Sequence, residues 1–140
     1  MSVLQGVYVL IIQLSIDSNV YVGKLGTINL SKGIYAYIGS AQTALEKRIA
    51  RHLRQEKRVF WHIDHLLQDP NAKILKVFTT VADKQEECKI AKKIAAKGET
   101  VEGFGCSDCL CTSHLVRIND HSFLYKLMQE YALPRLSESS

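Results

Sequence analysis

The chain has 140 residues, of which 46% are hydrophobic and 23% charged. This composition excludes a disordered or fibrous protein and fits one globular domain with a sizeable core. The net charge of +4 favours an anionic partner, because the basic residues gather between Lys47 and Arg58.

Membrane and secretory signals are weak. The longest apolar run, residues 7–12, is too short to span a bilayer, and no basic leader precedes a cleavage-like site. Three of the four cysteines crowd into residues 106–111, which suits a reducing compartment better than a disulfide framework. We therefore expect a cytoplasmic protein without a membrane partner. The absence of repeats and linkers predicts one domain over residues 1–136 and a polar tail over residues 137–140.

Alternating and β-branched residues predict strands in the first part of the chain. These are residues 6–14, a short strand at 20–23, a loop or further short strand at 25–31, and a strand at 34–38. The last of them is expected to stop at Gly39 and to lead directly into a helix. It pairs antiparallel to the first strand if the connection is a meander.

A helix is predicted over residues 42–55, because an apolar residue recurs at every fourth position from Ala41 to Leu53. Arg48 and His52 flank this apolar stripe. The opposite side of the helix, which is expected to face water, carries four basic residues: Lys47, Arg51, Arg54 and Arg58. This basic face is either a solvated helix surface or a contact surface for the phosphate backbone of a nucleic acid.

Further elements follow in the second half of the chain. Asp83, with Glu86 three residues later, is typical of a helix N-terminus. The predicted elements are a helix at 60–67 ended by a turn at 69–71, a strand at 74–81, a helix from Asp83 to about Lys97, a strand at 114–118 and a terminal helix at 122–131.

Two strands and the helix after them share a recognisable pattern. Gly6-Val7-Tyr8 lies in the first strand, and Tyr37-Ile38-Gly39 is followed by Leu45, Arg48 and His52. This pattern resembles the signature of the GIY-YIG nuclease superfamily, in which YIG precedes Leu-x-x-Arg-x-x-x-His or Tyr. Taken singly, each tyrosine would be interpreted as a strand core residue with a bonded hydroxyl.

The resemblance extends over most of the chain. Residues 61–67 and 103–111 resemble an uncharacterised branch of that superfamily, also seen appended to archaeal endonuclease III proteins. A second YIG-like run starts at Tyr21, but residues 25–33 supply neither an arginine at the family spacing nor a helical stripe. The choice of Tyr37 implies an extra hairpin after the first strand. Ser40 stands where the family often has lysine.

The resemblance implies an α+β fold with a small central antiparallel sheet flanked by helices. It also implies metal-dependent hydrolysis of phosphodiester bonds in DNA or RNA, with DNA as the favoured substrate. Arg48 would bind the phosphate, His52 would assist, and Tyr8 or Tyr37 would act as the base or position the water. Such chemistry needs a carboxylate that holds a hard divalent cation, Mg²⁺ or Mn²⁺.

The carboxylate is expected on the helix that follows Asp83. At 100° per residue, Glu87 falls within the apolar stripe that includes Ala91 and Ile94, whereas Glu86 falls outside it. A carboxylate on an apolar face is costly unless it meets a cation or a hydrogen-bond donor. Glu87 is therefore the candidate metal ligand, and an ion pair with a structural lysine or arginine is the alternative.

Two other functions compete with the nuclease. One is a nucleic-acid-binding module on the same fold without catalysis, favoured by Ser40 and by the long separation of Tyr8 from Tyr37. The other is a zinc-stabilised interaction module, for which four soft ligands lie close together: Cys106, Cys109, Cys111 and His114. One short stretch can hardly surround a tetrahedral ion, so buried free thiols are the favoured interpretation.

Overall fold

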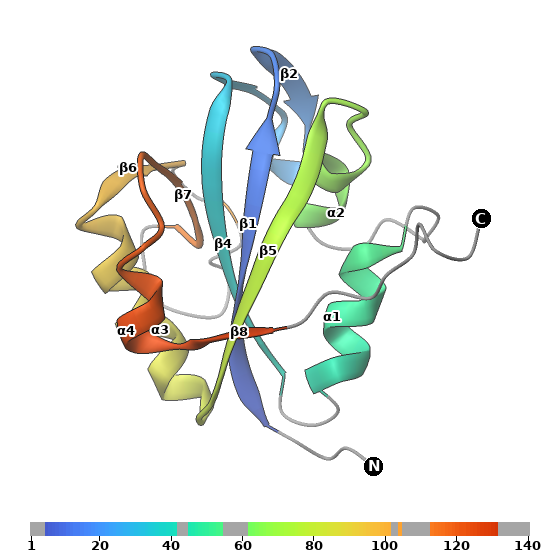
Figure 1. Ribbon diagram of the computed structural model, residues 1–140. Helices are drawn as coiled ribbons and strands as arrows, with labels where there is room; N and C mark the ends of the chain where they lie inside the picture. Colours follow the sequence, from blue (N-terminus) through green and yellow to red (C-terminus); the bar gives the residue numbers. More distant parts are fainter. Residues whose placement is uncertain (1–4, 42–44, 55–61, 102–103, 105–112, 132–140) are drawn as a thin grey trace.

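The computed structural model describes residues 5–41, 45–54, 62–101, 104 and 113–131. In these residues, six strands form an antiparallel sheet in the order β6-β7-β4-β1-β5-β8 (Figure 1). The central strands β1 and β4 pair along their whole length, from Gly6 opposite Ala41 to Leu14 opposite Gly33. The bounds are β1 (Gly6–Leu14), β4 (Gly33–Ala41), β5 (Ala72–Val81), β6 (Gly98–Thr100), β7 (Leu115–Ile118) and β8 (Gln129–Tyr131).

Helices cover both faces of this sheet, as Figure 1 shows. The helices are α1 (Leu45–Leu53), α2 (His62–Leu67), α3 (Lys84–Ala95) and α4 (Leu124–Leu127). Alternation along β1 divides the core, because successive side chains point to opposite faces. Tyr8 and Leu10 pack in one buried cluster with α1 and α2, whereas Val7 and Val9 pack in another with α3 and α4. The expected α+β class, a small antiparallel sheet flanked by helices, is confirmed.

The chain between β1 and β4 forms the extra hairpin that the spacing of the two tyrosines implied. Strands β2 (Ser18–Tyr21) and β3 (Thr27–Leu30) pair antiparallel, with the short 3-10 helix η1 (Gly23–Leu25) between them. Gly26 has a φ of 82°, a backbone conformation that favours glycine and closes the hairpin. The alternative YIG-like run belongs to this hairpin.

Strand β4 is longer than predicted. It does not stop at Gly39 but continues to Ala41, because β1 pairs with it as far as Gly6. Gly39 lies opposite Tyr8 in this register, and a Cβ atom there would collide with the Tyr8 hydroxyl and ring. The glycine therefore makes room for a tyrosine rather than ending the strand.

The predicted terminal helix over residues 122–131 is wrong. Only the single turn α4 is helical, after which Met128 is extended and β8 pairs with residues 77–79 of β5. An unpaired strand edge leaves backbone N–H and C=O groups without hydrogen-bond partners. Strand β8 provides these partners for part of β5. Strand β6 was not predicted either; it pairs with β7 on the opposite edge of the sheet.

The other predicted elements agree with the structure within a few residues. Helix α3 starts after Asp83, whose carboxylate accepts a hydrogen bond from the Gln85 N–H at 3.1 Å. Helix α2 ends before the turn that contains Asp69. In the described part of the chain, no helix is long and apolar enough to cross a membrane. The predictions at residues 42–44, 55–61, 102–103, 105–112 and 132–140 lie outside the described residues.

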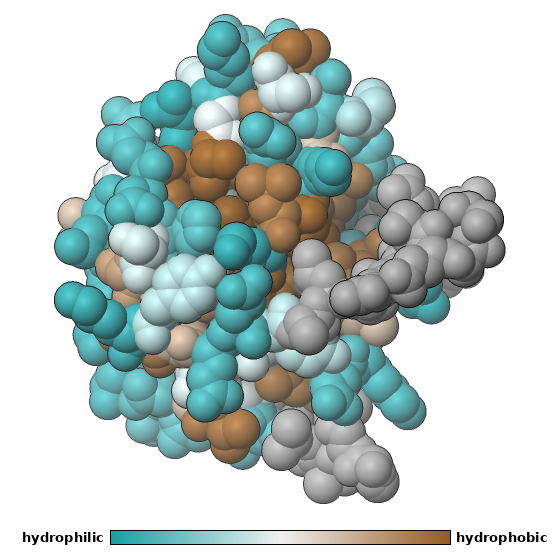
Figure 2. All heavy atoms as spheres, viewed as in Figure 1, coloured by the Kyte–Doolittle hydropathy of each residue, from teal (hydrophilic) through white to brown (hydrophobic). Residues whose placement is uncertain are grey.

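Viewed as in Figure 1, this face of the molecule is mainly hydrophilic around its rim, and hydrophobic side chains gather near its middle, in front of the upper part of β5 (Figure 2). On β5 itself, Leu75 and Val81 are exposed.

We predict that Gly39→Ala lowers the free energy of unfolding by about 1–3 kcal/mol, because the new methyl group collides with Tyr8. Tyr8→Leu removes both the hydroxyl and the ring carbons that the methyl group would meet, so the same substitution should cost less in that background. Urea denaturation of the two single variants and the double variant measures this coupling. Strictly additive costs would show that Gly39 does not make room for the tyrosine.

Candidate functional site

The candidate site lies at the end of β4, where its pairing with β7 stops. The β4–β7 register runs from Ile34 to Tyr37, and the Ile38 N–H donates to the His114 carbonyl at 2.9 Å. Backbone N–H and C=O groups of alternate residues point to the same side of a strand. Ser40 therefore directs its backbone groups to the same edge as Ile38, just beyond the last bond to the β7 side.

Tyr8 and His52 form a buried pair on the α1 face of the sheet. The Tyr8 hydroxyl and His52 Nε2 are 2.6 Å apart, and both residues are at most 2% exposed. The ring of Tyr37 lies edge-on to His52, with 6.3 Å between ring centroids. The structure thus brings both tyrosines close to the histidine of α1.

Burial keeps both phenols protonated. It raises the pKa of Tyr8 well above its ordinary value, although the charge of Arg48 and a hydrogen bond from its side chain act in the opposite direction. Burial also raises the pKa of Tyr37, and the neighbouring Tyr8 adds to this effect. At neutral pH, Tyr8 can therefore donate its proton to His52 Nε2 whenever that nitrogen carries none.

Arg48 extends from α1 to the C-terminal end of β4. Its Nη1 donates to the backbone carbonyl of Ser40 at 3.1 Å. A guanidinium has five donors in a fixed planar arrangement, a geometry suited to binding phosphate oxygens. Its position beside the Tyr8–His52 pair places a permanent positive charge next to two proton-carrying groups.

Glu87 lies on the buried side of α3, as its helical phase predicted, and is only 7% exposed. Its Oε1 accepts a hydrogen bond from the Ser40 hydroxyl at 2.7 Å, and its Oε2 lies 3.2 Å from His114 Nδ1. Glu86 is more exposed and forms an ion pair with Lys89. Of the two glutamates, Glu87 is therefore the one directed at β4.

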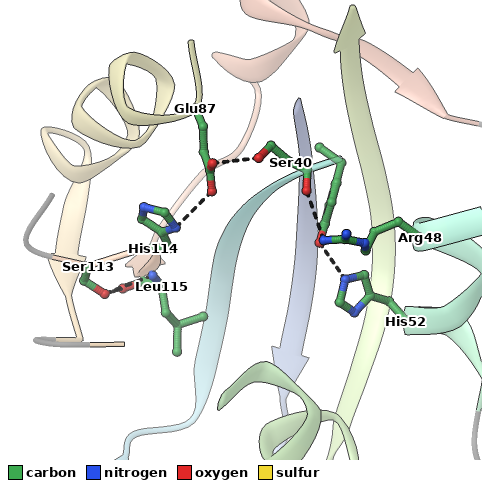
Figure 3. A network of polar contacts seen from close by, with 8 residues as sticks. Ser40, Arg48, His52, Glu87, Ser113, His114 and Leu115 are labelled. Carbon is green, nitrogen blue, oxygen red and sulfur yellow. Dashed lines mark hydrogen bonds and ion pairs between the residues drawn. The ribbon is translucent and has the colours of Figure 1, made fainter. Parts of the chain in front are cut away.

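Glu87 does not share one cleft with Tyr37 and Arg48. Figure 3 shows Glu87 and His114 on one side of β4 and Arg48 and His52 on the other, with Ser40 between them. The reason is strand alternation: the Ser40 side chain points to the α3 face, whereas Tyr37 and Gly39 face α1. The two halves meet at Ser40 rather than in an open groove.

The two halves are nevertheless electrostatically coupled. The Glu87 charge contributes to the raised pKa values of both Tyr8 and Tyr37, whereas the Arg48 charge lowers them. The order of the contacts excludes a serine-hydrolase arrangement, because the carboxylate of Glu87 stands between Ser40 and His114. A nucleophilic serine needs the imidazole in the middle.

The basic face of α1 differs from its prediction at Arg51. Instead of facing water, Arg51 donates through Nη1 and Nη2 to the two carboxylate oxygens of Asp64, each at 2.9 Å. The Asp64 side chain is fully buried and that of Arg51 is 20% exposed. This ion pair ties α1 to α2, leaving Lys47 and Arg54 as the exposed basic residues of the described part of this face.

The predicted zinc ligands are only partly described. His114 pairs with Glu87, while Cys106, Cys109 and Cys111 lie outside the described residues. Within the described ranges, no group of three or more potential ligands is close enough to hold a metal ion. The position of His114 therefore places it with the α3 half of the site.

Sequence reasoning missed three of the groups that organise the site: Ser40, His114 as a partner of Glu87, and Asp64 as a partner of Arg51. Strand alternation could have identified the first two. Ser40 shares a face with Ile38, and His114 shares that face with Val116, so both point toward α3. Nothing local signals the bond between Arg51 and Asp64, because it depends on how two helices pack.

We predict that Arg51→Met lowers the free energy of unfolding by about 3 kcal/mol, because the buried Asp64 carboxylate would lose its bidentate ion pair with the guanidinium. Lys47→Met, on the exposed side of the same helix, should change it by less than about 0.5 kcal/mol. Urea denaturation of both variants provides the comparison. Equal free energies of unfolding for the two variants would show that the Arg51–Asp64 ion pair does not stabilise the fold.

Comparison with known proteins gives one match. The family model described as a domain of unknown function, DUF123, matches residues 7–134. No similar protein was found among curated sequences, and no similar structure among solved ones. Apart from Gly6, the first residue of β1, the matched region includes every described strand and helix. The chain therefore belongs to the DUF123 family.

Proposed function

We propose that this protein is a metal-dependent nuclease of the GIY-YIG type that acts in the cytoplasm. Its substrate is a phosphodiester bond in DNA or RNA, and DNA is the favoured assignment. The observation that carries the proposal is the meeting of Arg48 and Glu87 at one residue, Ser40. The hydrogen bonds are 3.1 Å to its carbonyl and 2.7 Å from its hydroxyl. The Tyr8–His52 pair lies beside the same strand end. A phosphate-binding cation, a carboxylate and a proton-transfer pair are the groups this reaction needs.

The residues on the α3 side fit a hard divalent cation. Mg²⁺ and Mn²⁺ favour carboxylate and other oxygen ligands, and Mg²⁺ usually keeps several water molecules. The Glu87 carboxylate offers about four acceptor positions, so it can ligate an ion while keeping its contacts to Ser40 and His114. A bound ion would neutralise charge that develops on the phosphate during cleavage.

The remaining groups of the chain have separate roles in this proposal. Arg48 holds the non-bridging oxygens of the phosphate at the end of β4. Tyr8 passes its proton to His52 Nε2 while its oxygen takes a proton from the attacking water, so the relay conserves protons. The 2.6 Å contact supports Tyr8 as the tyrosine that acts as base, with Tyr37 positioning the water.

Nucleic-acid binding is proposed to use the exposed basic residues Lys47 and Arg54. Arg51 is withdrawn from this role, because its guanidinium is engaged by Asp64. Lysine and arginine contacts to phosphates make binding sensitive to salt. The substrate would thus lie across α1 and reach the end of β4.

A second candidate function is a nucleic-acid-binding module without catalysis. It is favoured by the burial of the central groups, since Tyr8 is 2% and Glu87 7% exposed. A reacting phosphate needs access to these side chains. Binding through Lys47 and Arg54 alone does not require access to Tyr8 or Glu87.

We predict that wild-type protein with Mg²⁺ or Mn²⁺ cleaves at least one member of a panel of DNA flaps, nicked duplexes and structured RNAs. Glu87→Gln should reduce cleavage on the order of a hundredfold, because the amide no longer attracts a cation. Arg48→Ala should cause a similar loss while retaining most of the binding. Glu86→Gln is the matched control and should retain activity, since Glu86 pairs with Lys89 on the surface.

Binding isotherms at several salt concentrations, run in parallel, separate the two functions. A protein that binds the panel with steep salt dependence but leaves every substrate intact would favour the binding module. Equal cleavage by the Glu87→Gln and Glu86→Gln variants would refute the assignment of the metal ligand.

A further inference from the structure

Ser40 makes one contact to each half of the candidate site. We propose that Ser40 is a positioning residue that couples Arg48 to Glu87 across β4. This inference rests on the proposed nuclease function. The Ser40 hydroxyl donates to Glu87 Oε1 at 2.7 Å, and its carbonyl accepts from Arg48 Nη1 at 3.1 Å (Figure 3).

Strand geometry explains why one residue reaches both groups. A side chain in a strand is perpendicular to the sheet, whereas the backbone N–H and C=O lie in its plane. The Ser40 side chain therefore meets α3 on one face, and its carbonyl is available to Arg48 at the strand edge beyond the Ile38–His114 bond. The neighbours Gly39 and Ala41 have the opposite phase and lack a polar side chain.

The chemistry of the hydroxyl suits a carboxylate that must also attract a cation. A neutral O–H donor fixes the orientation of Glu87 Oε1 without cancelling its charge, whereas a lysine would form an ion pair and compete with a metal. His114 contacts the other oxygen, Oε2, at 3.2 Å. With both oxygens held, rotation of the carboxylate about its last bond is restricted.

The coupling follows from the two contacts together. Restraining Ser40 through Glu87 also restrains the carbonyl to which Arg48 donates. The phosphate-binding cation and the metal-binding carboxylate are then held at a fixed separation, which is what preorganised catalysis requires. Loss of the hydroxyl should loosen both groups, although neither is itself altered.

The test compares two substitutions of nearly equal shape, Ser40→Thr and Ser40→Val. Threonine keeps the hydroxyl and valine replaces it with a methyl group. Ser40→Val should raise the Mn²⁺ concentration for half-maximal cleavage by about tenfold or more and lower kcat at saturating Mn²⁺, whereas Ser40→Thr should restore both toward wild type. Ser15→Ala, which removes a serine hydroxyl bond to the Asn71 carbonyl just after the other end of β1, is the control and should change neither.

A second measurement does not depend on activity. The Nε–Hε signal of Arg48 in ¹H–¹⁵N NMR spectra reports on its guanidinium. Glu87→Gln should shift this signal in the wild-type and Ser40→Thr backgrounds, and should shift it less in the Ser40→Val background. A merely structural role for Ser40 would alter stability without removing this response.

Each outcome separates the two claims. Equal metal dependence and equal NMR responses in the threonine and valine variants would overturn the role of Ser40, even if wild-type protein cleaves its substrate. Absence of cleavage in wild-type protein, together with an NMR response that requires the hydroxyl, would reject the nuclease function and retain the coupling.

Discussion

The hydrogen bond between Ser40 and Glu87 is the interaction on which the candidate site depends. A buried carboxylate is costly unless donors compensate for the water that it loses. Glu87 is 7% exposed, and its two oxygens face the Ser40 hydroxyl and the His114 imidazole. The same contact joins α3 to the end of β4, so the orientation of a charged group and the packing of a helix on the sheet are set together.

The tyrosine half of the site depends on a different constraint, the absence of a side chain at Gly39. Because that position is bare, Tyr8 can lie over β4 and reach His52 on α1. Burial there keeps the phenol neutral, and the nearby Arg48 charge partly offsets this effect. A neutral phenol can donate its proton to the imidazole with which it forms a hydrogen bond. An ionised phenol has no proton to donate.

Much of this arrangement follows from sequence patterns, because it is local. The alternation in β1, the four-residue apolar spacing of α1 and the cap at Asp83 predicted these elements, and the phase of α3 identified Glu87 rather than Glu86 as buried. Tertiary pairing decided the rest. The residues of β8 lie in a helix-like pattern but pair with β5, and Arg51 lies in a basic stripe but binds Asp64. Neither partner is near in sequence, so no local pattern could predict it.

We propose that Glu87, oriented by the Ser40 hydroxyl, holds a divalent cation at the end of β4. Paramagnetic broadening by Mn²⁺ tests it most directly, since backbone amide signals near a bound ion lose intensity at low metal concentration. We predict selective broadening of the Ser40, Glu87 and His114 amide signals in wild-type protein, and loss of this broadening in the Glu87→Gln variant. Broadening confined to exposed carboxylates such as Asp17 or Asp120, unchanged by Glu87→Gln, would contradict it.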